Sequence, residues 1–220
     1  MITVHYIGDS TVARNNIHSY PQTGMSQGLQ LYLKESVSIV SYAKNGRSTK
    51  SFLDEGRFGP VKEAMQAGDF LFIQFGHNDE KDDPARHTDP AGSFRDNLRL
   101  FIGAARESGA HPVLITPIGR RLFDENGTFL PGSHGAYPAA VKAVAAQENV
   151  PVIDLTAATE AFLAALGDEP SKPLFMWPKD NTHLKPEGAV QMAGLLARGL
   201  AELGGIYTAL LAGTDEGAGV

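Results

Sequence analysis

Short apolar runs alternate along the chain with longer segments in which apolar residues recur at helical spacing. Short runs that are rich in Val, Ile, Leu and Phe are typical of strands buried on both faces. The predicted strands are Ile2 to Ile7, Val37 to Tyr42, Phe70 to Phe75, Pro112 to Thr116 and Val150 to Leu155. The pattern therefore predicts five buried strands.

The longer segments predict helices, and the last of them begins with proline, which is common in the first turn of a helix. The predicted helices are Gly24 to Lys34, Pro60 to Met65, Ala91 to Ser108, Ala136 to Gln147 and Pro186 to Leu203. Strands that alternate with helices form a mainly parallel sheet covered on both faces. We therefore expect an α/β fold, a three-layer α/β/α sandwich with a five-stranded mainly parallel sheet. In such sheets ligands bind beyond the carboxyl ends of the strands.

Two segments depart from this pattern. Arg121 to Pro131 carries Asn126-Gly127 between two apolar pairs, which predicts a small hairpin after the fourth strand, close to the expected site. The end of the chain, Thr214 to Val220, is rich in Gly and small residues, and we expect it to be frayed.

Length and composition narrow the possible classes of protein. A chain of 220 residues fits a single domain, residues 1–220. The net charge of -6 provides no broad basic surface, so we do not expect nucleic acid as a partner. The absence of cysteine excludes disulfides, thiolate catalysis and Cys-based zinc sites. No membrane span or signal peptide is evident, which predicts a cytoplasmic protein, or a secreted one if a signal peptide has been trimmed from the sequence.

A serine and a histidine lie where this fold is expected to bind a ligand. Gly8-Asp9-Ser10-Thr11 follows the first predicted strand, although Gly-Asp-Ser is also an ordinary turn composition. Asp180-Asn181-Thr182-His183 lies in a loop before the last predicted helix. There, Asp180 can accept a hydrogen bond from one ring nitrogen of His183 and leave the other free to take a proton from a serine. A surface histidine beside a turn aspartate is the alternative.

Two further turns follow predicted strands. In Gly76-His77-Asn78-Asp79, the amide of Asn78 either donates to a developing oxyanion or bonds the backbone of its own turn. Gly46 follows Asn45 after the second strand, where its N–H faces the site or its positive φ merely closes a turn.

The order of these blocks resembles the SGNH (GDSL) hydrolase superfamily over nearly the whole chain. The matching blocks are Ile7-Gly8-Asp9-Ser10, Gly46, Gly76-His77-Asn78-Asp79 and Asp180-Asn181-Thr182-His183. The resemblance implies a flavodoxin-like fold and a serine esterase in which Ser10 attacks an ester, His183 accepts its proton and Asp180 holds the imidazole. It also implies that Ser10, Gly46 and Asn78 form the oxyanion hole. No metal or organic cofactor is expected.

More narrowly, Gly8 to Thr11, Phe75 to Asp79 and Asp180 to Leu184 look like the rhamnogalacturonan acetylesterase branch, which removes acetyl groups from pectic polysaccharide. Arginine forks suit the carboxylate of galacturonate, although surface ion pairs explain such residues equally well. Aromatic faces suit sugars, although packing is the favoured explanation for isolated aromatic residues. The candidate substrate contacts are Arg47, Arg120, Arg121, His134 and Trp177.

Two other functions stay open on the sequence alone. An esterase or thioesterase for other short acyl groups would use the same catalytic residues, because they do not determine the alcohol. A noncatalytic carbohydrate-binding protein would keep the sugar contacts without chemistry. Neither G-x-G-x-x-G nor the P-loop pattern occurs, which disfavours a nucleotide-binding protein. The expected partner is an acetylated oligosaccharide or polysaccharide, and the oligomeric state stays open.

Overall fold

The computed structural model describes residues 1–213, which contain a five-stranded sheet in the order β2-β1-β3-β4-β5. Every neighbouring pair of strands is parallel. The strands are β1 (Ile2–Gly8), β2 (Val37–Ser41), β3 (Phe70–Gln74), β4 (His111–Ile115) and β5 (Val152–Ile153). All five predicted strands are present, so the parallel α/β sheet is confirmed.

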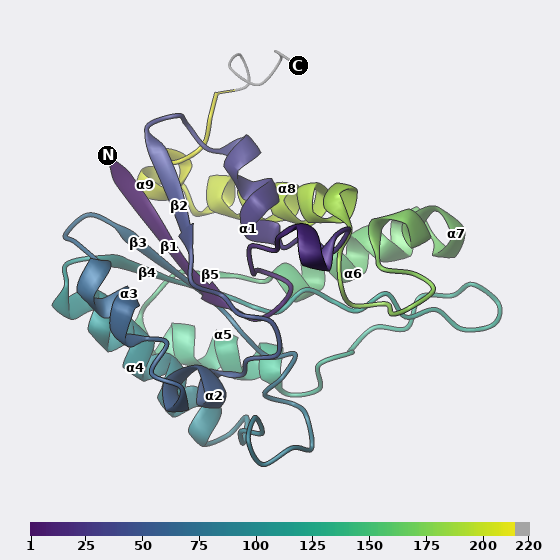
Figure 1. Ribbon diagram of the computed structural model, residues 1–220, viewed down its shortest axis with the longest axis horizontal. Coiled ribbons are helices and arrows are strands. Elements are labelled where there is room, and N and C mark those ends of the chain that lie inside the picture. The colour runs from purple at the N-terminus through teal and green to yellow at the C-terminus, as the bar shows by residue number, and fades with distance from the viewer. Residues whose placement is uncertain (214–220) are drawn as a thin grey trace.

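Helices cover both faces of the sheet (Figure 1). On one face, apolar residues of the sheet pack against α1 (Met25–Leu29), α6 (Leu155–Leu166) and α8 (Pro186–Leu203). On the other face, the core is completed by α2 (Thr49–Asp54), α3 (Gly59–Ala64), α4 (Ser93–Glu107) and α5 (Tyr137–Glu148). The smaller helices are α7 (Asp168–Ser171), α9 (Gly205–Thr208) and the 3-10 turns Ile17–Ser19, Gln30–Tyr32 and Lys172–Leu174. The predicted three layers are confirmed.

The structure differs from the sequence prediction at β5 and at two helices. The last strand is only two residues long because the Asp154 side chain accepts a hydrogen bond from Ala157 N and caps α6. The predicted strand included Leu155, the first residue of α6. The rest of α6 was not predicted, because its Ala-rich sequence does not confine apolar residues to one face of a helix. Helix α2 was also missed, since its cap, Ser48, lies in a segment that resembled a polar turn.

The predicted hairpin after β4 is present. Phe123 and Phe129 form an antiparallel bridge, and Leu130 N donates to Leu122 O at 2.9 Å. Gly127 closes the turn with a φ of 77°, a conformation that glycine adopts without strain. The expectation of a frayed tail concerns residues 214–220, which lie outside the described residues.

Helices α1 and α8 approach each other so closely that glycine is required between them. A Cβ atom at Gly28 would lie 2.6 Å from the carbonyl oxygen of Ala189. Helix α1 is bonded to the turn that carries Ser10 through Met25 N and Thr11 O at 2.8 Å, while α8 directly follows the loop that carries His183. This contact therefore fixes the two candidate catalytic segments relative to each other.

A buried carboxyl, Asp79, joins the loop after β3 to the start of α2. Its oxygens accept hydrogen bonds from Thr49 N at 3.0 Å, Thr49 Oγ1 at 2.5 Å and Thr88 Oγ1 at 3.0 Å. Burial raises the pKa of Asp79 to about 7, although the hydrogen bonds from Thr49 and Thr88 favour the ionised form. The loops that follow β2 and β3 are thus held together at one edge of the sheet.

The contact between α1 and α8 predicts opposite effects for the same substitution at two glycines. Gly28→Ala places a methyl group against the α8 backbone and should lower the free energy of unfolding by about 1 to 3 kcal/mol. Gly103→Ala on α4, where a Cβ atom meets nothing within 4 Å, should raise it by roughly 0.5 to 1 kcal/mol. Denaturant unfolding compares the two, and equal stabilities would contradict this account of the helix contact.

The raised pKa of Asp79 predicts a pH-dependent stability. An unfolded Asp has a pKa of about 3.9, so the folded protein binds more protons between about pH 4 and pH 7. The contribution of Asp79 to stability should therefore decrease as the pH rises through this window. We therefore expect the free energy of unfolding of Asp79→Asn, measured relative to that of the wild type, to rise by on the order of 2 to 4 kcal/mol from pH 4.5 to pH 7.5.

Urea unfolding at several pH values measures this difference. Asp82→Asn, at an exposed position three residues away, provides the control and should show little change relative to the wild type over the same range. A free-energy difference between Asp79→Asn and wild type that stays constant with pH would rule out a titrating, buried Asp79.

Candidate active site

Ser10 lies on a tight turn directly after β1, at the carboxyl edge of the sheet. The carbonyl oxygen of Asp9 accepts hydrogen bonds from Val12 N at 3.2 Å and Ala13 N at 3.0 Å, so the chain reverses immediately after the strand. The carboxylate of Asp9 accepts from Thr11 N at 2.9 Å and from Thr11 Oγ1 at 2.8 Å. These bonds fix the turn that presents the Ser10 hydroxyl.

The structure brings Ser10, His183 and Asp180 into one chain of hydrogen-bond contacts. His183 Nε2 lies 2.9 Å from Ser10 Oγ, and His183 Nδ1 lies 3.1 Å from Asp180 Oδ2. In the neutral tautomer with its hydrogen on Nδ1, His183 donates to Asp180 and accepts from Ser10. This is the arrangement that a serine nucleophile and its general base require.

The loop before α8 orients Asp180 toward His183. Asp180 Oδ1 accepts from His183 N at 2.7 Å and from Thr182 N at 2.9 Å. Burial by itself raises the pKa of the Asp180 carboxyl, but the hydrogen bonds from His183 and Thr182 outweigh burial and hold that pKa below its ordinary value. Asp180 therefore remains a carboxylate at neutral pH.

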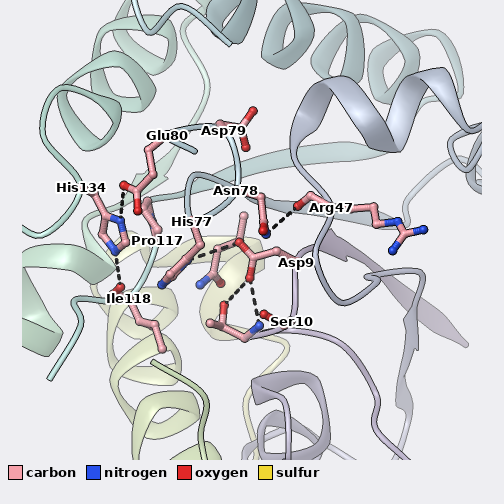
Figure 2. A network of polar contacts seen from close by, with 12 residues as sticks. Asp9, Ser10, Arg47, His77, Asn78, Asp79, Glu80, Pro117, Ile118 and His134 are labelled. Atoms are coloured by element: carbon pink, nitrogen blue, oxygen red, sulfur yellow. Dashed lines mark hydrogen bonds and ion pairs between the residues drawn. The ribbon is translucent and has the colours of Figure 1, made fainter. Parts of the chain in front are cut away.

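Three hydrogen-bond donors lie on the loops that surround Ser10. Asn78 Nδ2 donates one hydrogen to Arg47 O at 3.1 Å, which leaves its second amide hydrogen for another acceptor (Figure 2). The N–H groups of Ser10 and Gly46 donate to no protein group within residues 1–213. The loop that carries Gly46 is joined to β1 by Lys44 N and Gly8 O at 3.1 Å, and Gly46 itself has a φ of 78°.

A buried polar contact links the nucleophile turn to the Asn78 loop. Asp9 Oδ2 lies 3.3 Å from His77 Nδ1, and Figure 2 shows the Asp9 side chain between Ser10 and His77. Burial lowers the pKa of His77 to about 4 despite the Asp9 carboxylate, so the ring is neutral at pH 7. Burial raises the pKa of Asp9, but His77 and the Thr11 hydrogen bonds outweigh it and keep that pKa below its ordinary value.

Two of the predicted substrate contacts are enclosed by the protein. Arg121 is 3% exposed, and its guanidinium bonds Ser171 and the carboxylate of Asp168. His134 is 1% exposed, and its ring nitrogens lie 2.9 Å from Glu80 Oε2 and 2.8 Å from Ile118 O. Both side chains thus have partners within the fold, and packing accounts for their positions.

The other three predicted contacts are more accessible, although each also has a neighbour. Arg47 pairs with Glu55, and Arg120 pairs with Glu80. Trp177 is 41% exposed, but the Arg121 guanidinium lies 4.7 Å from the centre of its ring. A role for these three residues in binding substrate stays a prediction.

Sequence reasoning gave His77 a supporting role in its turn but missed its contact with Asp9, and it missed Arg86 altogether. Gly8 of β1 pairs with Gln74 of β3, so the residues that follow these two strands emerge side by side. This register is the signal that relates Asp9 to His77. Arg86 Nη1 donates to Asn78 Oδ1 at 3.2 Å from a long polar loop, and nothing in the local sequence marks that contact.

Another serine has the spacing of a nucleophile turn but different surroundings. Ser26 lies in Gly24-Met25-Ser26-Gln27-Gly28, which matches G-x-S-x-G. Its hydroxyl is buried without a hydrogen-bond partner, and the segment forms the start of α1 rather than a turn after a strand. Among the described residues, Ser10 is the serine whose hydroxyl contacts a histidine ring.

Within the part of the chain that the structure describes, there is neither a cluster of metal-binding side chains nor a membrane-spanning helix. Within residues 1–213, no three side chains of His, Asp or Glu gather in a way that could hold a metal ion. No helix in that range has both the length and the apolar character needed to cross a membrane.

Comparisons of the sequence with known proteins identify the family of this chain. Residues 6–190 match the model of the GDSL-like lipase/acylhydrolase family. The chain is 44% identical to rhamnogalacturonan acetylesterase RhgT of Bacillus subtilis, over 92% of this chain and 91% of RhgT. It is 40% identical to the probable rhamnogalacturonan acetylesterase YesY of the same organism, over 91% of this chain and 93% of YesY.

Solved structures share the fold of this chain. Protein YxiM of Bacillus subtilis superposes with a TM-score of 0.82 at 27% identity, covering 92% of this chain but only 56% of YxiM. The acetylxylan esterase Axe2 of Geobacillus stearothermophilus shares the fold, with a TM-score of 0.65 at 19% identity and coverage of 94% and 95% of the two chains. The chain therefore belongs to the GDSL-like lipase/acylhydrolase family.

Proposed function

We propose that this protein is a serine esterase that removes acetyl groups from rhamnogalacturonan or its oligosaccharides. The hydrogen-bond chain from Asp180 through His183 to Ser10 is the observation on which the proposal rests. Because this chain joins a hydroxyl to a base and the base to a carboxylate, it provides the nucleophile, the general base and the orienting carboxylate of serine acyl transfer. A protein that only binds carbohydrate would have no use for such an arrangement.

In the proposed mechanism, Ser10 Oγ attacks the acetyl carbonyl carbon while its proton passes to His183 Nε2. The resulting oxyanion accepts hydrogen bonds from Asn78 Nδ2 and from the N–H groups of Ser10 and Gly46. When the tetrahedral intermediate collapses, the sugar oxygen leaves with the proton from His183. Water then attacks the acetyl-Ser10 ester with His183 as base, which releases acetate and restores the Ser10 hydroxyl.

Asp180 contributes throughout this cycle by holding His183. Its lowered pKa keeps it charged while the imidazole gains and loses a proton, and that negative charge stabilises the imidazolium that forms in each half-reaction. The backbone hydrogen bonds to Asp180 also fix the rotation of the ring toward Ser10.

The substrate assignment is supported by the relatives rather than by a sugar-shaped pocket. One Bacillus relative is named a rhamnogalacturonan acetylesterase and the other a probable one, and each aligns with about nine tenths of this chain. We propose that the substrate is an acetylated rhamnogalacturonan chain or oligosaccharide. Arg47, Arg120 and Trp177 remain the candidate contacts to its sugars.

The test is acetate release from acetylated rhamnogalacturonan by the wild type and by Ser10→Ala. We expect loss of the nucleophile to lower the rate by at least about 10⁴-fold, as in enzymes with the same constellation. Ser108→Ala, at the end of α4 on the far side of the fold from the turn after β1, is the matched control and should keep the wild-type rate.

A Ser10→Ala protein that still releases acetate at the wild-type rate would refute the nucleophile. A panel of p-nitrophenyl esters from acetate to octanoate tests the acyl group separately. If the wild type hydrolyses these esters but leaves acetylated rhamnogalacturonan untouched, the esterase chemistry stands and the proposed substrate is wrong.

A further inference from the structure

The side-chain amide of Asn78 is fixed by a contact at each of its polar atoms. Nδ2 donates to Arg47 O at 3.1 Å, and Oδ1 accepts from Arg86 Nη1 at 3.2 Å. Rotating the amide by 180° would set its oxygen against a carbonyl and its NH₂ group against a guanidinium, so both contacts would become repulsive. The two neighbours therefore decide which way the amide points.

Arg86 reaches Asn78 from a loop that folds back over the end of β3. Thr88 N donates to Asp79 O at 3.1 Å, and Thr88 Oγ1 donates to Asp79 Oδ1 at 3.0 Å. The hydroxyl of Tyr137 donates to Asp79 O at 2.8 Å. These buried bonds anchor the loop two residues beyond Arg86, so its approach to Asn78 is set by the fold.

The contact between Arg86 and Asn78 is charge-assisted. The Arg86 side chain is 34% exposed, and its Nε donates to Asp83 Oδ2 at 2.7 Å, whereas Asn78 is only 6% exposed. A guanidinium remains protonated at any working pH. A charged donor on the amide oxygen polarises the amide and strengthens its remaining N–H as a donor.

We propose that Arg86 is a positioning residue for the oxyanion hole. It holds the Asn78 amide in the orientation that presents Nδ2 to the oxyanion, and its charge strengthens that hydrogen bond in the tetrahedral intermediates. Arg86 acts through Asn78 and not by direct contact with the substrate. The inference rests on the proposed function, because it requires Asn78 to serve as an oxyanion donor.

The test is a double-mutant cycle with p-nitrophenyl acetate as substrate. This ester is uncharged, so an arginine does not attract it electrostatically. We expect Arg86→Met to lower kcat about 10-fold with KM unchanged within about 2-fold, a smaller loss than the 10²- to 10³-fold cost of removing a whole oxyanion donor. In an Asn78→Ala background, Arg86→Met should change kcat by less than about 2-fold, since no amide remains to be oriented.

Two further variants separate this role from a general effect on the protein. Arg86→Lys keeps a charged donor and should recover part of kcat. Arg57→Met is the matched control: its side chain is 33% exposed and its Nε pairs with Glu55, much as Arg86 pairs with Asp83, but it does not contact Asn78. We expect Arg57→Met to keep the wild-type kcat and KM.

The inference is overturned if Arg86→Met leaves kcat unchanged, or if it lowers kcat equally with and without Asn78. The Asn78→Ala variant distinguishes a failure of this inference from a failure of the oxyanion role on which it rests. If Asn78→Ala itself leaves kcat unchanged, the oxyanion assignment fails and the role of Arg86 fails with it. If Asn78→Ala is damaging while Arg86→Met is silent, only the role of Arg86 is refuted.

Discussion

The parallel pairing of β1 with β2 and with β3 is the constraint on which the site depends. Parallel strands all end at the same edge, so the turns that carry Ser10, Gly46 and Asn78 emerge there together. The base comes from the opposite end of the sequence, 173 positions from Ser10, on the loop before α8. The close contact between α1 and α8 at Gly28 holds this loop against the turn after β1.

Buried polar contacts then fix the loops that the sheet brings together. Asp9 faces His77 beneath the nucleophile turn, and Asp79 binds the start of α2 to the loop after β3. Burying ionisable side chains in this way costs free energy unless hydrogen bonds or charges compensate. The cost is reflected in the raised pKa of Asp79 and the lowered pKa of His77. Such loops have few alternative positions, which suits a site whose donors must be placed before the reaction begins.

Much of this arrangement follows from local sequence patterns. The apolar runs located all five strands, and the rule that ligands lie beyond their carboxyl ends selected Ser10 and Asn78. The distance of three residues between Asp180 and His183 suggested their contact, because a single loop turn brings them together. These features could be predicted because each depends on residues close in sequence or on the common edge of a parallel sheet.

The remaining features depend on contacts between distant segments. Arg121 was predicted to contact the substrate, but it pairs with Asp168 and Ser171 and is buried. Nothing in the sequence near Arg121 indicates these two partners. Arg86 meets Asn78 from a loop that Thr88 anchors to Asp79. Helix α6 was missed since its Ala-rich sequence shows no clear apolar stripe, and its cap at Asp154 ended β5 early.

The central claim, that Ser10 is a nucleophile activated by His183, is tested most directly by covalent labelling. A fluorophosphonate reacts with an activated serine hydroxyl with loss of fluoride, and mass spectrometry of peptides locates the adduct. The account predicts one adduct per chain, on Ser10, and almost none in a folded His183→Ala variant. Labelling at Ser26 or another residue with Ser10 unmodified, or labelling of Ser10 at an equal rate without His183, would contradict it.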